Sequence, residues 1–309
     1  MSVFGKTPNF DFMGKRRLAE VLSAVMIIVS LGSIFVRGMN FGIDFTGGVL
    51  LEVAYEGTAD LAEIREVLTE GGFGTPLVQN FGTADEALIR LPPQEDQDGG
   101  AIRDSVLSAL QARDPTVELR RIEFVEAQVG EDLTEQGSLA MLIALILIFI
   151  YVMLRFRWKF AAGAIAALVH DVIILVGYFS VFGISFDLTI VAAILATIGY
   201  SLNDTIVVFD RIRENFRIMR RGSAVDIVNT SINQMLARTL ITALTTLLVL
   251  IALFVLGGES VSGFALALIV GIVVGTYSST YIASALALAL DVSPADLMPA
   301  KREEVDELP

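Results

Sequence analysis

The sequence T-I-G-Y-S-L-N-D-T-I-V-V-F-D-R-I-R-E-N, from Thr197 to Asn215, places an aspartate, Asp204, inside a long apolar segment. A carboxylate at that depth costs several kcal/mol in lipid unless it is paired, solvated or protonated, so such residues usually face the interior of a helix bundle. Asn203 precedes it, and a cluster of arginines follows the apolar segment. The stretch therefore predicts a polytopic α-helical membrane protein that uses Asp204 in transport or other ion-driven work.

The composition of the whole chain agrees with a membrane protein. Of its 309 residues, 54% are hydrophobic and only 18% are charged. Six apolar segments reach or approach the length that spans a bilayer, and they cover residues 18–36, 138–154, 160–182, 187–209, 234–256 and 262–289. The first has basic flanks but no small-residue cleavage site after it, so we interpret it as a membrane helix and not as a signal peptide.

Basic residues predict which side of the membrane each loop faces. They lie before the first segment, in the 2–3 and 4–5 loops and in the tail, whereas the short 3–4 and 5–6 loops have none. Because cytoplasmic loops carry an excess of Lys and Arg, we expect both termini to be cytoplasmic. The predicted organisation is a cytoplasmic N-terminus (1–17), a first membrane helix (18–36), an extracytoplasmic α+β domain (37–137), five further membrane helices (138–290) and a cytoplasmic tail (291–309).

The extracytoplasmic domain has the pattern of a ferredoxin-like α+β fold. Strands are predicted at 49–55, 76–81, 87–91 and 117–125, and helices at 59–70 and 101–112. This is the β-α-β-β-α-β order of the split βαβ unit, a fold that hosts many functions. Residues 37–137 hold 7 basic and 20 acidic residues, so the net charge of −13 lies in this domain. We interpret the acidity as a source of solubility, with attraction of a basic partner as the alternative.

The motif G-I-D-F-T-G-G, from Gly42 to Gly48, joins the first membrane helix to the first strand. Its glycines predict a tight backbone path at this junction. A phosphate-binding loop is not favoured, because the Lys-Ser/Thr ending and the following helix of that motif are absent from the pattern.

Two polar stripes are predicted at a similar depth on consecutive membrane helices. The first comprises Thr197, Ser201 and Asp204, and the second comprises Arg238, Thr242 and Thr245. An Asp204–Arg238 pair would keep the carboxylate ionised, and breaking the pair would let it take up a proton, which couples helix movement to proton passage. The alternatives are a static ion pair that only fixes packing, and an arginine that reaches the membrane interface.

His170 and Asp171 lie near the middle of the third apolar segment, and His170 is the single histidine of the chain. Histidine titrates near neutral pH, so a role in a proton relay is chemically reasonable. Neighbouring residues on a helix point about 100° apart, so the two side chains need not face the same cavity. The alternative is that they hydrogen-bond to Ser or Thr side chains of neighbouring helices.

Several other kinds of site are not favoured by the sequence. One histidine, no cysteine and no H-E-x-x-H pattern argue against a metal site or a disulfide framework. An intramembrane aspartyl protease is disfavoured because its G-x-G-D and Y-D signatures are missing and Asp171 and Asp204 differ in depth. No Ser-His-Asp arrangement occurs either. We therefore expect no cofactor and no enzymatic activity.

Four sequence features together resemble the SecD/SecF family of protein-export membrane proteins, and its SecF branch in particular. They are G-I-D-F-T-G-G after the first helix, His170-Asp171 in the third, S-L-N-D-T-I-V-V-F-D-R-I-R-E-N through the fourth and S-I-N-Q-M-L-A-R-T at the fifth. The resemblance covers nearly the whole chain, from Asn9 to about Leu290. The SecD branch differs in having a far larger extracytoplasmic region.

The resemblance implies half of an RND-superfamily transporter in the bacterial inner membrane, with SecD as the other half and the soluble domain in the periplasm. YajC, the SecYEG channel and the translocating preprotein are the further partners that it implies, together with membrane lipid, and nucleic acid is not among them. The implied function is to use the proton or sodium motive force to promote late steps of preprotein translocation and release at the periplasmic side.

The resemblance also assigns residues. Asp204, beside Asn203, would be the ion-coupling carboxylate, and Arg238, followed by Thr239, its membrane partner. The predicted ion-coupling residues are therefore Asp204, Arg238, Asp171, Asn203 and Thr239. The family motif at the membrane–periplasm junction would comprise Gly42, Asp44, Phe45, Thr46, Gly47 and Gly48. The alternative function is half of a small-molecule RND exporter, which the small soluble domain makes less favoured.

Overall fold

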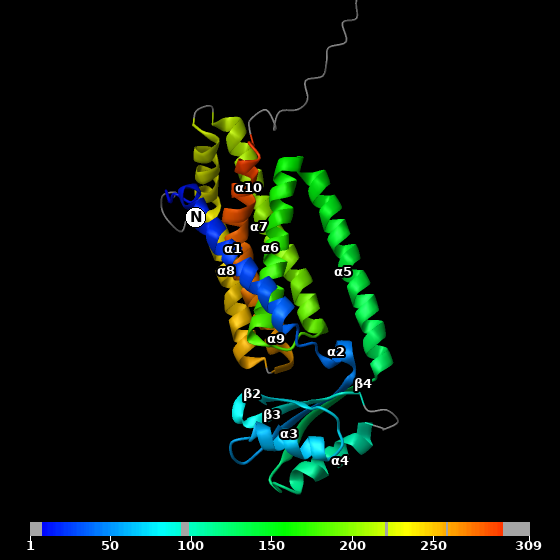
Figure 1. Ribbon diagram of the computed structural model, residues 1–309. Coiled ribbons are helices and arrows are strands. Elements are labelled where there is room, and N and C mark those ends of the chain that lie inside the picture. Colours follow the sequence, from blue (N-terminus) through cyan, green and yellow to red (C-terminus); the bar gives the residue numbers. More distant parts are fainter. Residues whose placement is uncertain (1–7, 94–98, 220–221, 258, 293–309) are drawn as a thin grey trace, which may run out of the picture. The chain divides into compact units, whose positions relative to one another are not determined.

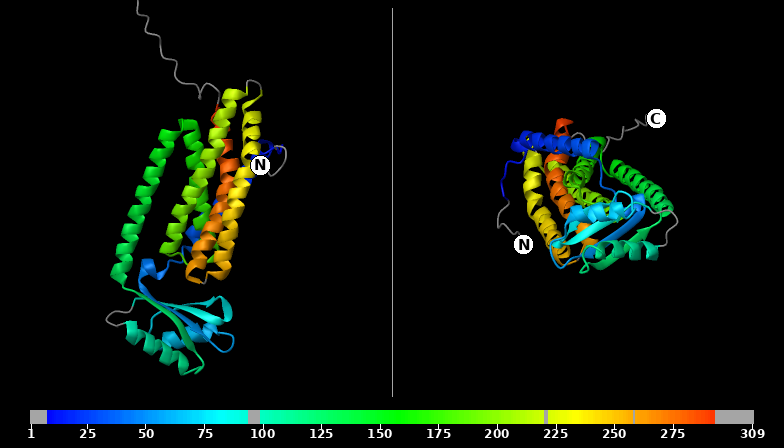
Figure 2. Two further views of the ribbon diagram at one scale, coloured as in Figure 1. Left: turned by 180° about the vertical axis from the view of Figure 1, so that it is seen from behind. Right: turned by 60° about the horizontal axis from the view of Figure 1, so that its bottom comes forward.

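The structure, a computed structural model, describes residues 8–93, 99–219, 222–257 and 259–292. Its chain forms two compact units (Figures 1 and 2). The helical unit comprises the described residues within Met1–Gly38, Ile143–Ile184 and Ala192–Pro309, and the sheet unit comprises those within Met39–Leu142 and Ser185–Val191.

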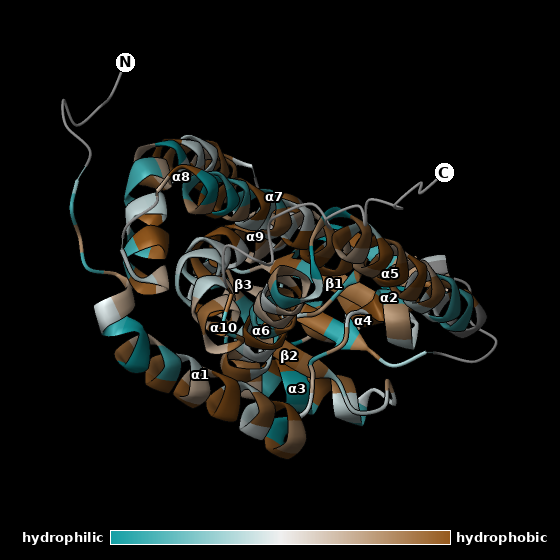
Figure 3. Cartoon of the chain, turned by 90° about the horizontal axis from the view of Figure 1, so that it is seen from above, coloured by the Kyte–Doolittle hydropathy of each residue, from teal (hydrophilic) through white to brown (hydrophobic). Residues whose placement is uncertain are grey.

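The described residues contain six helices that are long and apolar enough to cross a membrane, as the sequence predicts. They are α1 (Arg16–Arg37), α5 (Ala127–Arg155), α6 (Trp158–Phe182), α7 (Leu188–Ile218), α8 (Ala224–Leu256) and α9 (Glu259–Ser278), the last of which continues through a π-helical turn (Ser279–Ala283) into α10 (Ser284–Ala289). A short 3₁₀ turn, Met13–Lys15, precedes α1. Hydrophobic residues cover much of the surface of α1 and α5, as a lipid-facing helix requires (Figure 3).

The helix α6 is the most buried of the six, with 61% of its apolar window enclosed, against 17% for α1 and 6% for α5. Small residues let its neighbours approach closely. A side chain at Gly177 would meet Ser30 of α1, and one at Gly163 would meet the backbone of Ala283. This close packing is typical of membrane helix bundles, and it places the polar residues of α6 in the interior of the helical unit.

The helices α7 and α8 extend beyond the bounds that the apolar pattern predicts. The first continues to Ile218, so the arginines at 211, 213 and 217 belong to a helix and not to the predicted loop. The second begins at Ala224, and not near 232–234 as expected. Hydropathy predicts only the apolar part of each helix. The polar ends of α7 and α8 remain helical because they bond to each other, for example through Asn215 Nδ2, which donates to Ser231 Oγ at 2.8 Å.

The sheet unit has the predicted β-α-β-β-α-β order. Its elements are β1 (Gly48–Ala54), α3 (Leu61–Glu70), β2 (Leu77–Phe81), β3 (Thr83–Leu91), α4 (Gly99–Gln111) and β4 (Glu118–Val125). The strands pair in the order β2-β3-β1-β4, and all neighbours are antiparallel. The helices α3 and α4 lie on one face of this sheet and enclose the core with it (Figure 1). The β3 strand begins four residues earlier than predicted, because Gly82, at φ 67°, makes the β2–β3 turn tight.

The glycine-rich junction follows a tight path, as its sequence predicts. A one-turn helix, α2 (Ile43–Thr46), is followed by Gly47 at φ 66° and Gly48 at φ 119°. A side chain at Gly48 would place its Cβ 2.3 Å from the carbonyl oxygen of Leu91. Both the positive φ angles and this close approach to β3 require glycine.

Candidate functional site

The carboxylate of Asp204 is held by hydroxyl groups from two other segments of the helical unit. Asp204 lies on α7 and is half-buried. Thr239 Oγ1 on α8 donates to Asp204 Oδ1 at 2.9 Å, and Ser279 Oγ donates to Oδ2 at 2.8 Å. Ser279 is the first residue of the π-helical turn, a local feature that is frequent at functional sites. Uncharged donors of this kind can bond either an ionised or a protonated carboxyl group.

The predicted Asp204–Arg238 ion pair is not formed in this structure. Within the part of the chain that the structure describes, the salt bridges do not include one between these residues, and the Arg238 side chain is exposed. Thr242 Oγ1 donates to the backbone carbonyl of Arg238 at 2.8 Å, and Thr245 likewise bonds to its own helix. Asn203 is exposed. The α8 residue that bonds to Asp204 is thus Thr239, one of the predicted ion-coupling residues, and not Arg238.

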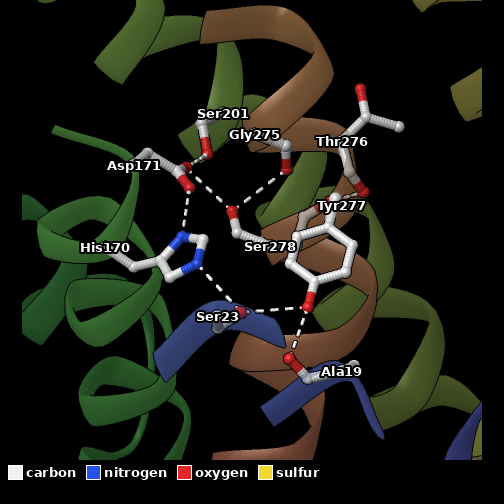
Figure 4. Close-up of polar contacts among 10 residues, drawn as sticks. Ala19, Ser23, His170, Asp171, Ser201, Gly275, Thr276, Tyr277 and Ser278 are labelled. Atoms are coloured by element: carbon white, nitrogen blue, oxygen red, sulfur yellow. Dashed lines mark hydrogen bonds and ion pairs between the residues drawn. The ribbon is translucent and has the colours of Figure 1, made fainter. Parts of the chain in front are cut away.

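A second carboxylate, Asp171 on α6, lies in a fully enclosed polar cluster (Figure 4). The exposed fraction of Asp171 is 1% and that of His170 is 4%. Asp171 Oδ2 accepts hydrogen bonds from Ser201 Oγ at 2.6 Å and from Ser278 Oγ at 2.8 Å. Its Oδ1 lies 2.9 Å from His170 Nδ1. The two neighbours in sequence therefore do meet, and serines of α7 and α9 complete the cluster.

The cluster continues from His170 to α1 through hydroxyl groups. His170 Nε2 lies 3.0 Å from Ser23 Oγ, which lies 2.9 Å from the hydroxyl oxygen of Tyr277. Tyr277 donates to the carbonyl oxygen of Ala19 at 2.6 Å. Four of the hydroxyl residues at the two carboxylates were not predicted as site residues from the sequence: Ser23, Tyr277, Ser278 and Ser279. Their only signal is that they are polar residues within apolar segments, which does not reveal their partners.

The predicted polar stripe of α7 divides between the two carboxylates. Ser201 bonds to Asp171, whereas Asp204 lies one turn further along and bonds to α8 and the π-helical turn. Thr197, the third member, has a buried hydroxyl with no hydrogen-bond partner among the described residues, and it packs against Gly271 of α9. The two sites are therefore adjacent along α7 but separate in their contacts.

The described residues contain no group of three or more His, Asp or Glu side chains that could hold a metal ion. The sequence contains no cysteine that could add a ligand. A buried carboxylate such as that of Asp204 or Asp171 is a chemical group that can bind and release a proton or a small cation.

The motif residues at the junction make contacts inside the sheet unit. Asp44 Oδ2 accepts from the backbone N–H of Leu188 at 3.0 Å. The Phe45 ring stacks on Phe186, with centroids 6.0 Å apart. Thr46 Oγ1 donates to the carbonyl of Gly42 at 3.2 Å. These residues fix the backbone of the junction and the segment that precedes α7, and their groups do not form an ion-binding cluster among the described residues.

Comparisons with known proteins agree on one family. A family model described as "Protein export membrane protein SecD/SecF, C-terminal" matches residues 105–293, and one described as "SecD/SecF GG Motif" matches residues 32–59. The protein translocase subunit SecF of Vibrio alginolyticus is 52% identical over 306 residues, which are 97% of each chain. The SecF subunit of Pseudomonas aeruginosa is 46% identical and covers 98% of this chain and 99% of its own.

A solved structure gives the same result for the fold. The crystal structure of SecDF, a translocon-associated membrane protein from Thermus thermophilus, matches with a TM-score of 0.82 at 39% identity. The match covers 94% of this chain and 40% of that chain. The present chain therefore spans only part of the longer SecDF polypeptide.

Proposed function

Because the chain belongs to the SecD/SecF family of protein-export membrane proteins, with SecF subunits as its relatives, we propose that Asp204 couples an ion gradient to protein export. The chain is a multi-pass bacterial membrane protein and an accessory subunit of the Sec translocase, with SecD as its partner. The relatives do not favour the alternative of a small-molecule exporter.

The observation that carries the proposal is the environment of Asp204. A carboxylate inside an apolar bundle that is held by two hydroxyl donors, and by no ion pair among the described residues, can exist with or without a bound proton or sodium ion. Ion binding neutralises the charge and changes which hydrogen bonds the oxygens accept from α8 and the π-helical turn. This gives the two states that an ion-driven cycle needs.

In this proposal Arg238 acts in the second state. Arg238 is exposed and adjacent to Thr239 on α8, so a rotation of that helix, combined with the reach of the long arginine side chain, can exchange the Thr239 hydroxyl for the charge of Arg238 at Asp204. Pairing with Arg238 favours the ionised carboxylate and releases its ion. Thr239, Asn203 and Asp171 complete the proposed ion-coupling group. No enzymatic step is involved, since the ion gradient supplies the energy.

The remaining parts of the proposal concern location and partners. The protein lies in the bacterial inner membrane with both termini in the cytoplasm, and the sheet unit lies in the periplasm. YajC, the SecYEG channel and the translocating preprotein are the further partners, and the complex promotes late steps of translocation and release. The excess of Lys and Arg in the loops assigned to the cytoplasm supports this orientation.

Export of a secretory preprotein tests the proposal in cells whose only copy of this protein is Asp204→Asn. The amide is nearly isosteric but cannot bind a proton, so we expect export to be lost while the membrane level of the protein is unchanged. Asp132→Asn is the matched control, because Asp132 is an exposed carboxylate on α5. Normal export with Asp204→Asn would refute the role of Asp204.

A further inference from the structure

Hydrogen-bond directions in the cluster around His170 determine where its hydrogens lie. A series of hydrogen bonds runs from Asp171 through His170, Ser23 and Tyr277 to the backbone carbonyl of Ala19 (Figure 4). It joins α6, α1 and α9. A carbonyl oxygen can only accept, and each hydroxyl group has a single hydrogen to donate.

The directions follow from the end at Ala19. Tyr277 donates its hydrogen to Ala19, so the Tyr277 oxygen must accept from Ser23. Ser23 has then used its only hydrogen, and its oxygen must accept from His170 Nε2. If Tyr277 instead donated its hydrogen to Ser23, the lone pairs of the Tyr277 hydroxyl oxygen and the Ala19 carbonyl oxygen would face each other at 2.6 Å. His170 therefore carries a hydrogen on Nε2.

The contact between His170 Nδ1 and Asp171 Oδ1, at 2.9 Å, needs a second hydrogen on one of these two atoms. The pair then consists either of an imidazolium and a carboxylate or of a neutral imidazole and a carboxylic acid. Both forms have a net charge of zero. They hold one proton more than a neutral histidine beside an ionised aspartate.

Burial independently favours this extra proton. Both side chains are enclosed, and an uncompensated charge in such a place is costly. Among the described residues, no Lys or Arg forms an ion pair with Asp171, whose only charged partner is His170. The packed elements carry other titratable groups, among them Tyr277 on α9, Tyr281 in the π-helical turn, Asp204 on α7, and Arg16, Arg17 and Glu20 on α1. None of these supplies a bonded positive charge to Asp171 in the structure.

We propose that His170 and Asp171 together form a proton-binding site, separate from Asp204, whose occupancy sets the hydrogen bonds between α1 and α9. When the proton leaves Nε2, the Nδ1 hydrogen still bonds to Asp171, and Nε2 becomes an acceptor. Ser23 must then donate to His170. Tyr277 is left with one hydrogen for two acceptors, Ser23 and Ala19, so one hydrogen bond between α9 and α1 is lost. This inference does not depend on the role of Asp204 in export.

Nitrogen-15 NMR of the full-length protein in lipid bilayers tests the site directly. Because the sequence has one histidine, labelling with ¹⁵N-histidine gives the signals of His170 alone. Near neutral pH, we expect Nε2 to show a directly bonded hydrogen, and we expect this hydrogen to be lost as the pH rises. An Nε2 without hydrogen at neutral pH, with hydrogen on Nδ1 only, would overturn the proposal.

A pair of variants tests whether Tyr277 and the proton are coupled. Tyr277→Phe removes the acceptor of the Ser23 hydrogen, so Ser23 becomes free to donate to Nε2. By linkage, the proton should then leave at a pH that is lower by about one unit, the equivalent of one net hydrogen bond. Tyr178→Phe is the control, because Tyr178 lies on α6 and packs on Phe182. It should leave the titration unchanged.

An unchanged titration in Tyr277→Phe, or an equal shift in both variants, would overturn the coupling. Ser23→Ala provides a second variant should Tyr277→Phe not accumulate in the membrane. This substitution removes the acceptor of the Nε2 hydrogen, so it should also lower the pH at which the proton leaves. An Asp204→Asn background should leave these results unchanged, so failure of this proposal is distinguishable from failure of the proposed export role.

Discussion

Thr239 Oγ1 lies 2.9 Å from Asp204 Oδ1, so the contact of α8 with this carboxylate is a hydroxyl and not a guanidinium. Ser279 provides the other donor from the π-helical turn. The site is therefore held by two bonds that a modest helix movement can break, which suits a group that must load and unload an ion. An ion pair in the same place favours the ionised carboxylate, so in the proposed cycle it forms only in the state that releases the ion.

Replacing the hydroxyl donor tests this contact. Thr239→Val keeps the shape of the side chain but removes the bond to Asp204, and a hydrogen bond to a charged group contributes about 1.5–3 kcal/mol. We expect the rate of preprotein export to fall about tenfold. Thr242→Val is the matched control, since Thr242 is exposed and, within the described part of the chain, its hydroxyl bonds to its own helix. Equal export rates in both variants would show that the Thr239 contact is not used.

The glycine at the start of β1 is expected to be essential for stability. Gly48→Ala places a Cβ against the Leu91 carbonyl and strains a backbone at φ 119°, with a cost of about 3 kcal/mol or more. We expect a lower membrane level and faster proteolysis of the sheet unit. Gly57→Ala is the control, because a Cβ there meets open space. A normal level of Gly48→Ala would contradict the close approach to β3.

Arg90 stabilises the sheet unit through three hydrogen bonds. Its guanidinium donates to Asn40 Oδ1 at 2.9 Å, to the Phe41 carbonyl at 2.7 Å and to Ser185 Oγ at 2.8 Å. Burial lowers the pKa of this guanidinium, but an arginine remains charged at any physiological pH. Arg90→Met leaves these acceptors without their donor, and we expect a loss of about 2–4 kcal/mol in the free energy of unfolding.

Urea unfolding followed by limited proteolysis measures that effect. Arg90→Lys should recover only part of it, because a single ammonium group cannot reproduce the planar fork. Arg103→Met, which removes an exposed arginine of α4, should change stability by less than about 0.5 kcal/mol. An equal loss of unfolding free energy in Arg90→Met and Arg103→Met would show that the hydrogen bonds of Arg90 do not stabilise the sheet unit.

Alkaline pH is expected to destabilise the sheet unit through Tyr55. Burial, with the nearby charges of Asp114 and Glu63, raises the pKa of Tyr55 from 10.0 to about 12. The folded state thus holds this proton more tightly than the unfolded state, so the contribution is complete below pH 10 and is lost as the pH rises towards 12. Chemical unfolding at several alkaline pH values should show this loss in the wild type and a smaller one in Tyr55→Phe.

The orientation in the membrane can be tested with cysteine labelling, because the chain has no cysteine of its own. Glu66→Cys on α3 and Glu214→Cys near the end of α7 both replace exposed residues. In intact cells whose outer membrane has been permeabilised, we expect an impermeant maleimide to label the first and not the second. The opposite result would reverse the proposed topology.

The sequence by itself determined the six apolar helices and the β-α-β-β-α-β order of the sheet unit, and it predicted a role for Asp204. These features depend on local periodicity, on turn residues and on the high cost of a charge in lipid, all of which are written in neighbouring residues. The tight path at Gly47 and Gly48 could likewise be predicted from composition.

Only the tertiary structure decided which groups meet. Asp204 bonds to Thr239 and Ser279 and not to Arg238, and the Ser201 predicted to share its face bonds to Asp171 instead. Ser23 lies 147 positions from His170 and 254 positions from Tyr277 in the sequence, yet its hydroxyl group contacts both side chains. Helical periodicity gives the face of each residue along its own helix, but the rotation and depth of one helix against another follow from close packing across the bundle, which no single segment encodes.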